Sequence, residues 1–316
     1  MNQNRVLHFY TLIHTFLVLM VVACNTPEKE MVQKTPPYVV LQPLDKPELF
    51  GEGIISTPLP EFATSFSPQG NTVYFNIANE DRSILKIVKS TFTNGRWSEP
   101  ERLPFSDGTY RDVDPFVTHD GSRLYFSSNR PVRKGESKDD FDTWYVELRA
   151  EGWSEPINPG TPLNGEGSEI FVSTTKSGTI YFTAFDEGVG HIYRALESDG
   201  TYHIPERITL GLQDSISVGN PMVAPDESFL IFSSTMLPGE GGSDLFVSMR
   251  TEKGNWGEIK NLGSIVNSSY ADFAPAISPD GQYLFFTSER PGVVGAVLEG
   301  RPPGDLYQVL ISKIIP

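Results

Sequence analysis

Short runs of apolar and aromatic residues alternate with turns rich in Gly, Pro and Asp along most of the chain. Five of these runs share one form, a turn followed by a strand-like segment that contains a phenylalanine, as in "SPDGQYLFFTSERP". The five phenylalanines recur every 50 to 56 residues, at Phe75, Phe126, Phe182, Phe232 and Phe286. Self-similarity at such a period indicates a repeat architecture, and this reading takes priority over any local pattern.

Each repeat predicts four short strands. The turn between the first two contains glycine in four repeats, whereas the fourth repeat has Glu227 at the equivalent position. A third strand follows, for example "DTWYVELR" or "DLFVSMR", with the alternation and β-branched or aromatic content of a strand. In four repeats a glycine and then an aromatic residue, as in "EGWSEPIN", predict a hairpin into a fourth strand.

Four strands in about 53 residues are typical of a propeller blade. We therefore predict an all-β fold, a β-propeller of five four-stranded blades, with six blades as the alternative if residues 36–60 supply more strands. The fifth repeat lacks a fourth strand of its own. The segment "KPELFGEGIIS", residues 46–56, resembles the end of the fourth-strand motif and is predicted to fill that place. Such closure would remove two exposed sheet edges.

The N-terminal segment has the pattern of a lipoprotein signal. One charged residue, Arg5, precedes an apolar stretch that is short for a membrane span, and "VVAC" resembles the bacterial lipobox. We predict a signal peptide at residues 1–23, acylation of Cys24, a flexible linker at 24–45 and a propeller domain at 46–316. Cys24 is the single cysteine, which leaves no partner for an internal disulfide.

The expected location is the cell envelope, with the lipid anchor holding the protein to a membrane. Asn25 stands where an aspartate is associated with retention at the inner membrane, so the outer membrane, on its periplasmic or surface side, is favoured. The formal net charge is −15, and removal of Arg5 with the signal peptide makes it −16. This charge argues against nucleic acid as a partner, because its phosphates need clustered Lys and Arg.

The repeats resemble those of TolB and of other WD-repeat-like envelope propellers, including proteins that carry such repeats beside OmpA-type domains. The stretches that carry this resemblance are "NLGSIVNSSYADFAPAISPDGQYLFFTSERPG" and "DVDPFVTHDGSRLYFSSNRP". The resemblance covers nearly all of residues 46–312 and implies a propeller of the bacterial envelope. TolB-type relatives usually have six blades built from shorter units, and no segment here resembles an OmpA-type or TPR domain.

A propeller usually binds its ligands at one face of the ring. At this face the loops from the second to the third strand of each blade (2→3) meet the loops from the fourth strand to the first strand of the next blade (4→1). The second and fifth 2→3 loops are long, which is typical of binding loops on a rigid scaffold. Arg130 and Arg290 recur in "SSNRP" and "TSERP", and acidic residues enter the first strands of blades two, three and five. One hypothesis places a tentative binding site for a polar ligand or partner loop at these residues: Asp112, Asp114, Arg130, Glu169, Asp272 and Arg290. The other is that each arginine pairs with a neighbouring carboxylate and fixes one blade against the next.

The predicted function is non-catalytic binding or scaffolding of an envelope protein or a cell-wall glycan. The alternative is a carbohydrate-active hydrolase with two carboxylates across the channel mouth, drawn from Asp112, Asp114, Glu169 and Asp272. No G-x-S-x-G or H-E-x-x-H motif occurs, and three scattered histidines, His119, His191 and His203, do not form a metal pattern. We therefore predict no cofactor, no metal and no catalytic residue.

Overall fold

Five antiparallel sheets, each made almost entirely from one continuous segment, form the unit at residues 36–316. The computed structural model describes residues 35–39, 46–133, 135–198, 200–293 and 302–315. The predicted signal peptide, Cys24 and most of the predicted linker lie outside the described residues. No helix within the described ranges is long and apolar enough to cross a membrane.

The sheets follow one another along the chain and confirm the prediction of five blades. Blade one contains β2 (Glu61–Phe66), β3 (Thr72–Ala78), β4 (Leu85–Thr93), β5 (Arg96–Trp97) and β6 (Glu101–Arg102). Blade two contains β7 (Asp112–Val117), β8 (Arg123–Ser128), β9 (Asp142–Arg149) and β10 (Gly152–Trp153). Blade three contains β11 (Glu169–Thr174), β12 (Thr179–Asp186), β13 (Val189–Ser198), β14 (Thr201–Tyr202) and β15 (Glu206–Arg207).

Blade four contains β16 (Gly219–Val223), β17 (Phe229–Ser234), β18 (Asp244–Arg250) and β19 (Trp256–Asn261). Blade five contains β20 (Asp272–Ile277), β21 (Tyr283–Ser288) and β22 (Asp305–Leu310), followed by the 3-10 turn η1 (Ile311–Lys313). Its fourth place is taken by β1 (Glu48–Leu49), which pairs antiparallel with β22. The strand from the N-terminal segment is thus two residues long, shorter than the stretch 46–56 predicted for it.

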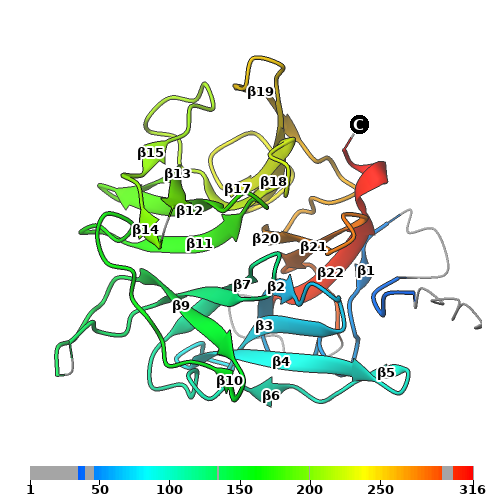
Figure 1. The fold of residues 1–316 in the computed structure, drawn as a ribbon. Helices are drawn as coiled ribbons and strands as arrows, with labels where there is room; N and C mark the ends of the chain where they lie inside the picture. The colour runs from blue at the N-terminus through cyan, green and yellow to red at the C-terminus, as the bar shows by residue number, and fades with distance from the viewer. Residues whose placement is uncertain (1–34, 40–45, 134, 199, 294–301, 316) are drawn as a thin grey trace, which may run out of the picture. The chain divides into compact units, whose positions relative to one another are not determined.

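The first strand of each blade lies toward the middle of the ring, where β2, β7, β11 and β20 are labelled in Figure 1. The strands alternate in direction, so the 2→3 and 4→1 connections gather at one end of the ring and the 1→2 turns at the other. We call these ends the loop face and the hairpin face. The five repeated phenylalanines all lie on second strands and are at most 1% exposed. Burial of each such ring stabilises the fold by about 2–3 kcal/mol.

Each first strand contains a β-bulge at the same place. At this bulge one residue of each first strand has a positive φ of 50° to 57°, although none of the five is glycine: Ala63, Asp114, Phe171, Asn220 and Ala274. The pairing with the second strand shifts at the same point in all five sheets. A left-handed conformation costs a non-glycine residue roughly 1–2 kcal/mol, so the bulge needs a compensating contact.

The compensating contact is a hydrogen bond to the preceding blade. The backbone N–H of Ala63 donates to Thr287 Oγ1 at 3.0 Å, which joins blade one to blade five. The equivalent N–H of Asp114 donates to Asn76 Oδ1 at 2.8 Å. Two further seams repeat this contact, Phe171 N to Ser127 Oγ and Asn220 N to Thr183 Oγ1, each at 3.1 Å.

Tyr38 lies within the predicted linker, yet it packs into the propeller. Its ring is 3% exposed and makes edge contacts with Phe66 and Phe285, 5.2 and 6.0 Å between centroids. A Cβ on Gly70, which has a φ of +70°, would come within 2.7 Å of the Tyr38 ring. Gly70 therefore serves two purposes, because it permits the hairpin turn and leaves space for this ring.

We expect replacement of Thr287 by valine to destabilise the ring at its closing seam. Valine has a similar volume but no hydroxyl, so the buried N–H of Ala63 would lose its acceptor at a cost of about 1–3 kcal/mol. Urea unfolding should show a lower midpoint with an unchanged slope. Thr287→Ser keeps the hydroxyl and should retain most of the stability; a Thr287→Val midpoint equal to that of the wild type would contradict the assigned role.

Candidate functional site

Four blades begin their first strand with a carboxyl group, at Glu61, Asp112, Glu169 and Asp272, and all four side chains are at most 5% exposed. Three of them accept a hydrogen bond from the backbone N–H four residues earlier. Thr57 N lies 3.0 Å from Glu61 Oε2, Ser268 N lies 2.6 Å from Asp272 Oδ2, and Gly165 N bonds Glu169. These carboxyl groups hold the ends of the 4→1 loops in place.

The two recurring arginines occupy matching positions. Arg130 Nη2 lies 2.6 Å from Asp112 Oδ1, and Arg290 Nη2 lies 2.7 Å from Asp272 Oδ1. Each guanidinium also donates to a 4→1 loop carbonyl, that of Phe105 or of Val266. Each arginine pairs with a nearby carboxylate, but the two partners belong to the same blade, and the contacts tie a 4→1 loop to the first strand instead of joining one blade to the next. In these contacts the arginines and aspartates are bonded to the protein itself.

Aromatic rings enclose both arginines. The guanidinium of Arg130 lies 5.1 Å from the ring centroid of Phe126 and 5.5 Å from that of Trp144. The Arg290 guanidinium similarly lies 5.4 Å from Phe286 and 5.1 Å from Tyr307. Such cation–π contacts add to the ion pair where water is excluded.

Burial raises the pKa of several carboxyl groups near the axis. It raises the pKa of Glu61 to about 8, with Asp305 a smaller contributor, and that of Glu169 to about 7. Burial alone raises the pKa of Asp114 to about 7. One oxygen of Glu169, Oε2, is buried without a hydrogen-bond partner. Asp114 and Glu169 thus lie on neighbouring first strands with pKa values near neutrality.

The hairpin face carries a cavity on the ring axis. Its volume is about 530 Å³, and the 1→2 hairpins of all five blades contribute to its wall. A second hollow of about 610 Å³ lies beside it between blades two and three. The two share three lining residues, Thr118, His119 and Lys176. The cavity that all five blades line therefore opens at the hairpin face. The sequence analysis had predicted a binding site at the opposite end, the loop face.

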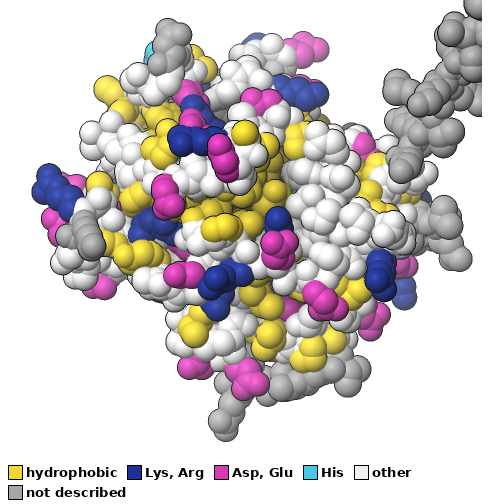
Figure 2. Space-filling model, turned by 60° about the horizontal axis from the view of Figure 1, so that its bottom comes forward, with side chains coloured by type: hydrophobic (Ala, Val, Ile, Leu, Met, Phe, Trp, Pro, Cys, Tyr) yellow, Lys and Arg dark blue, Asp and Glu magenta, His cyan; other side chains and the backbone are white. Residues whose placement is uncertain are grey.

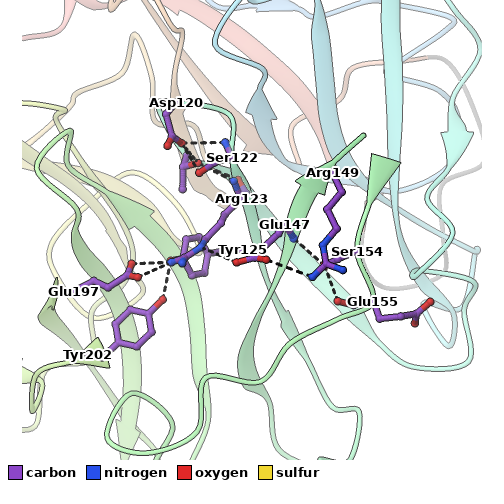
Figure 3. Close-up of polar contacts among 11 residues, drawn as sticks. Asp120, Ser122, Arg123, Tyr125, Glu147, Arg149, Ser154, Glu155, Glu197 and Tyr202 are labelled. Carbon is purple, nitrogen blue, oxygen red and sulfur yellow. Dashed lines mark hydrogen bonds and ion pairs between the residues drawn. The ribbon is translucent and has the colours of Figure 1, made fainter. Parts of the chain in front are cut away.

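The wall of the second hollow is a polar cluster that joins blades two and three (Figure 3). Arg123 Nη1 lies 2.7 and 2.8 Å from the two carboxylate oxygens of Glu197. The hydroxyl groups of Tyr125 and Tyr202 lie 2.7 Å apart, and burial raises the pKa of both phenols. Figure 3 shows Arg123 directed between Glu197 and Tyr125, so this cluster fixes the shape of the hollow.

Sequence reasoning did not assign these hairpin-face residues to a site. His119 is half-buried, and its Nε2 lies 2.8 Å from the Thr174 carbonyl of the next blade. Lys176 does not belong to any functional motif recognised in the sequence. The one available signal was that His119 and Lys176 depart from the proline found at this position in the other three hairpins, and such a departure does not identify a ligand.

Charged side chains of both signs are interspersed on the face shown in Figure 2, with hydrophobic side chains exposed between them. Lys and Arg do not gather there into one basic patch. Within the described ranges, no group of three or more His, Cys, Asp or Glu side chains is arranged to hold a metal ion.

No family model matches the chain, and no curated protein matches it. Solved structures do resemble it. A thermostable family-43 glycoside hydrolase aligns over 83% of this chain and 91% of its own, with 13% identity and a TM-score of 0.56. An α-L-arabinofuranosidase from Lactobacillus brevis aligns over 82% and 93%, with 13% identity and a TM-score of 0.50.

A TolB-type structure from Agrobacterium tumefaciens is also among these neighbours. It aligns over 81% of this chain and 91% of its own, with 15% identity and a TM-score of 0.49. The neighbours thus include a TolB-type protein alongside glycoside hydrolases. At these identities the likeness concerns the fold alone.

We expect Arg130→Met to lower stability by about 3–5 kcal/mol, because it leaves the Asp112 carboxylate buried without its ion-pair partner. The matched control is Arg133→Met, whose side chain is 83% exposed, and it should change stability by less than about 0.5 kcal/mol. Denaturant unfolding measures both variants. Normal unfolding of Arg130→Met combined with lost binding of a partner would instead assign Arg130 to a binding site.

The raised pKa of Glu61 predicts a dependence of stability on pH. Between its ordinary value of 4.5 and about 8, the folded protein holds a proton on Glu61 that the unfolded chain has released. This contribution is therefore complete below pH 4.5 and is lost as the pH rises toward 8. In Glu61→Gln the free energy of unfolding should fall less over pH 5 to 8 than in the wild type, as measured by urea unfolding at each pH. Equal slopes for the two proteins would contradict this assignment.

Proposed function

We propose that the chain is a non-catalytic envelope lipoprotein whose propeller docks a protein partner on its loop face. Acylated Cys24 would hold it to the membrane, at the outer membrane by the sequence argument. The observation that carries the proposal is the distribution of exposed apolar side chains. Of the ten large hydrophobic residues exposed among the described ones, seven lie at the loop face. Six are in 2→3 or 4→1 connections, and the seventh, Phe185, is near the end of strand β12 beside its 2→3 turn: Ile84, Tyr110, Val132, Met236, Ile265, Tyr270 and Phe185.

Apolar side chains at the loop tips are unusual enough to need a reason. A 2→3 or 4→1 loop gains no core packing from such a residue, and Val132 is 62% exposed and Met236 50% exposed. Exposed apolar residues that gather at one end of a molecule, set among charges, are typical of docking surfaces. Most of the seven are aliphatic, whereas a glycan site needs flat aromatic rings, so a protein partner is favoured over a glycan.

The attachment of the chain agrees with this assignment. Tyr38 is among the first residues of the propeller unit, and it packs against Gly70 in the blade-one hairpin. Tyr38 therefore packs at the hairpin face, at the other end of the ring from the seven exposed residues, and leaves the loop face uncovered.

One observation supports a second candidate function, a carbohydrate-active hydrolase. Asp114 and Glu169 lie on adjacent first strands, and each has a pKa of about 7, so one could be protonated while the other is ionised. Glycoside hydrolysis uses two carboxyl groups in such unlike states. If the full chain cleaved aryl glycosides and Asp114→Asn or Glu169→Gln abolished the cleavage, this function would replace the non-catalytic one.

The docking surface is tested by cross-linking the full chain in intact envelopes and identifying what is captured. A triple variant, Val132→Ser, Met236→Ser and Tyr270→Ser, should lose most of the captured partner because it removes apolar contacts. The control replaces the three exposed apolar residues that lie away from the loop face, Leu148→Ser, Leu196→Ser and Ile204→Ser, and should capture it normally. Equal capture by both variants would show that the loop face is not the docking surface.

A further inference from the structure

A pocket of about 300 Å³ lies between the 4→1 connection of blade three, residues 208–218, and the start of β13. It is separate from the axial cavity, and none of the seven exposed apolar residues of the loop face lines it. Its volume is at the lower end of the range for small-molecule sites. The matching connections of blades two and four hold side chains that blade three lacks at this place.

In blades two and four, the third strand begins with an aspartate that is bonded by an asparagine from the end of the same blade. Asn158 Nδ2 donates to Asp142 Oδ2 at 3.0 Å, and Asn261 Nδ2 donates to Asp244 Oδ2 at 2.9 Å. Each buried carboxylate thus has a side-chain partner that belongs to the repeat.

A second asparagine, six residues after the first, completes this arrangement. It accepts the backbone N–H of the residue after the aspartate, from Thr143 to Asn164 Oδ1 at 3.0 Å and from Leu245 to Asn267 Oδ1 at 2.8 Å. Its own Nδ2 donates to the oxygen of the first asparagine, at 3.0 and 2.7 Å. Two amide groups therefore fill the space between the third strand and the 4→1 connection.

Blade three has different residues at all three positions. The strand register places His191 at the position of the two aspartates and Arg207 at the position of the first asparagines. The residue six positions after Arg207 is Gln213, which is exposed. Since His191, Ile192 and Arg207 all line the pocket, it occupies the space that the two asparagine amides fill in the other blades.

The backbone of Ile192 presents a donor to this space. Ile192 corresponds to Thr143 and Leu245, and its C=O accepts the Ile208 N–H at 3.0 Å. The N–H and C=O of one strand residue point to the same side, so the Ile192 N–H is also directed toward the 4→1 connection. It lacks the asparagine oxygen that accepts the equivalent N–H in blades two and four.

His191 is the buried side chain that the pocket leaves without a partner. It is 4% exposed, and within the described ranges its ring makes no hydrogen bond. Burial lowers the pKa of His191, with Arg207 a smaller cause, so the neutral ring has one donor and one acceptor nitrogen. Buried polar groups normally have a hydrogen-bond partner, and a ligand in the pocket would supply the one that is missing.

The charges of the pocket wall are balanced. Arg207 Nη2 lies 3.0 Å from Asp214 Oδ1, and these are the two charged side chains among the lining residues. Asp186 is close enough to His191 to act on its pKa, but it is exposed and does not line the pocket. The wall therefore holds no unpaired charge for an ionic ligand. Much of the remaining wall is apolar and half-buried, from Leu210 to Ile216.

We propose that this pocket binds a small uncharged molecule with a carbonyl or hydroxyl oxygen on an apolar body. The oxygen takes the place of the missing asparagine amides, between the His191 ring and the Ile192 N–H. The apolar body packs on Leu210, Leu212 and Ile216. Neither the site nor its test depends on the docking function proposed for the loop face.

The probe is 2-naphthol, titrated into the full chain at pH 7 and followed by its fluorescence, with naphthalene as the analogue that lacks the oxygen. His191→Leu removes the ring nitrogens and should weaken 2-naphthol by about fivefold or more, without weakening naphthalene. The matched control is His203→Leu, which removes an exposed histidine of the same blade and should change neither. Equal loss of both probes in a folded His191→Leu would overturn the assigned hydrogen bond.

NMR of the histidine rings locates the probe. The chain has five histidines, so each ring resonance can be identified by its loss when that histidine is replaced. 2-Naphthol should shift the His191 resonance to saturation and leave that of His119, which lines the axial cavity, in place. A shift of His119 without one of His191 would overturn the proposal.

A second variant tests the apolar wall. Leu212→Ala removes part of it and should weaken 2-naphthol and naphthalene alike, by about threefold or more. Leu148→Ala, at an exposed position of blade two, is the control and should weaken neither. Unchanged binding in a folded Leu212→Ala would contradict this placement of the ligand.

Charged analogues test the chemical class of the ligand. 2-Naphthoate and 2-naphthylmethylamine carry a negative and a positive charge on the same rings, and each should bind more weakly than 2-naphthol because the wall offers no unpaired counter-charge. Tighter binding of either analogue than of 2-naphthol would overturn the assignment to an uncharged ligand.

Discussion

The hydrogen bonds that join each first strand to the preceding blade are the contacts on which the rest of the structure depends. At the closing seam, the N–H of Glu61 donates to the Gly304 carbonyl at 2.7 Å, and the N–H of Ala63 donates to Thr287. The bulge makes this possible, because it turns the N–H of Ala63 away from its own sheet. The same geometry recurs at seams within the chain order, so closing the ring needs no special contact. These seams leave the axis open at the hairpin face. The ring is narrower further along the axis, where Ala63, Phe171 and Ala274 cluster together.

The two ends of the ring use polar residues differently. At the loop face, carboxyl groups such as Asp112 and Asp272 bond their own loops and arginines, which leaves the loops anchored and their apolar tips exposed. At the hairpin face the turns are short, and Asp226 and Asp280 are bonded within them. The residues that recur with the repeat therefore maintain the fold. Exposed residues such as Val132 at one end and Lys176 at the other do not recur with the repeat.

Single residues show where sequence reasoning succeeded and where it could not. The absence of glycine from the fourth hairpin was visible in the repeat, and Glu227 nevertheless has a φ of +59°, the left-handed conformation that the glycines adopt at this position in the other hairpins. What the sequence did not contain was the contact that accompanies this conformation, a hydrogen bond from the Tyr181 hydroxyl of the preceding blade at 2.7 Å. Likewise Arg130 and Arg290 were recognised as equivalent, but whether they faced a ligand or a carboxylate depended on strands brought together by folding. The bond between His119 and the Thr174 carbonyl joins two blades, so no local sequence pattern could predict it.

The sequence by itself predicted five blades, with six as the alternative, together with the strands within each blade and the turns that join them. These features depend on periodic burial, as at Phe75 and Phe286, and on short-range backbone preferences. Both are determined by residues that are close together in the sequence. Only the tertiary structure decided which carboxyl groups are neutralised, that Tyr38 packs into the propeller, and that the axial cavity opens at the hairpin face. Those outcomes arise from contacts between residues tens to hundreds of positions apart, where desolvation and pairing depend on all five blades at once.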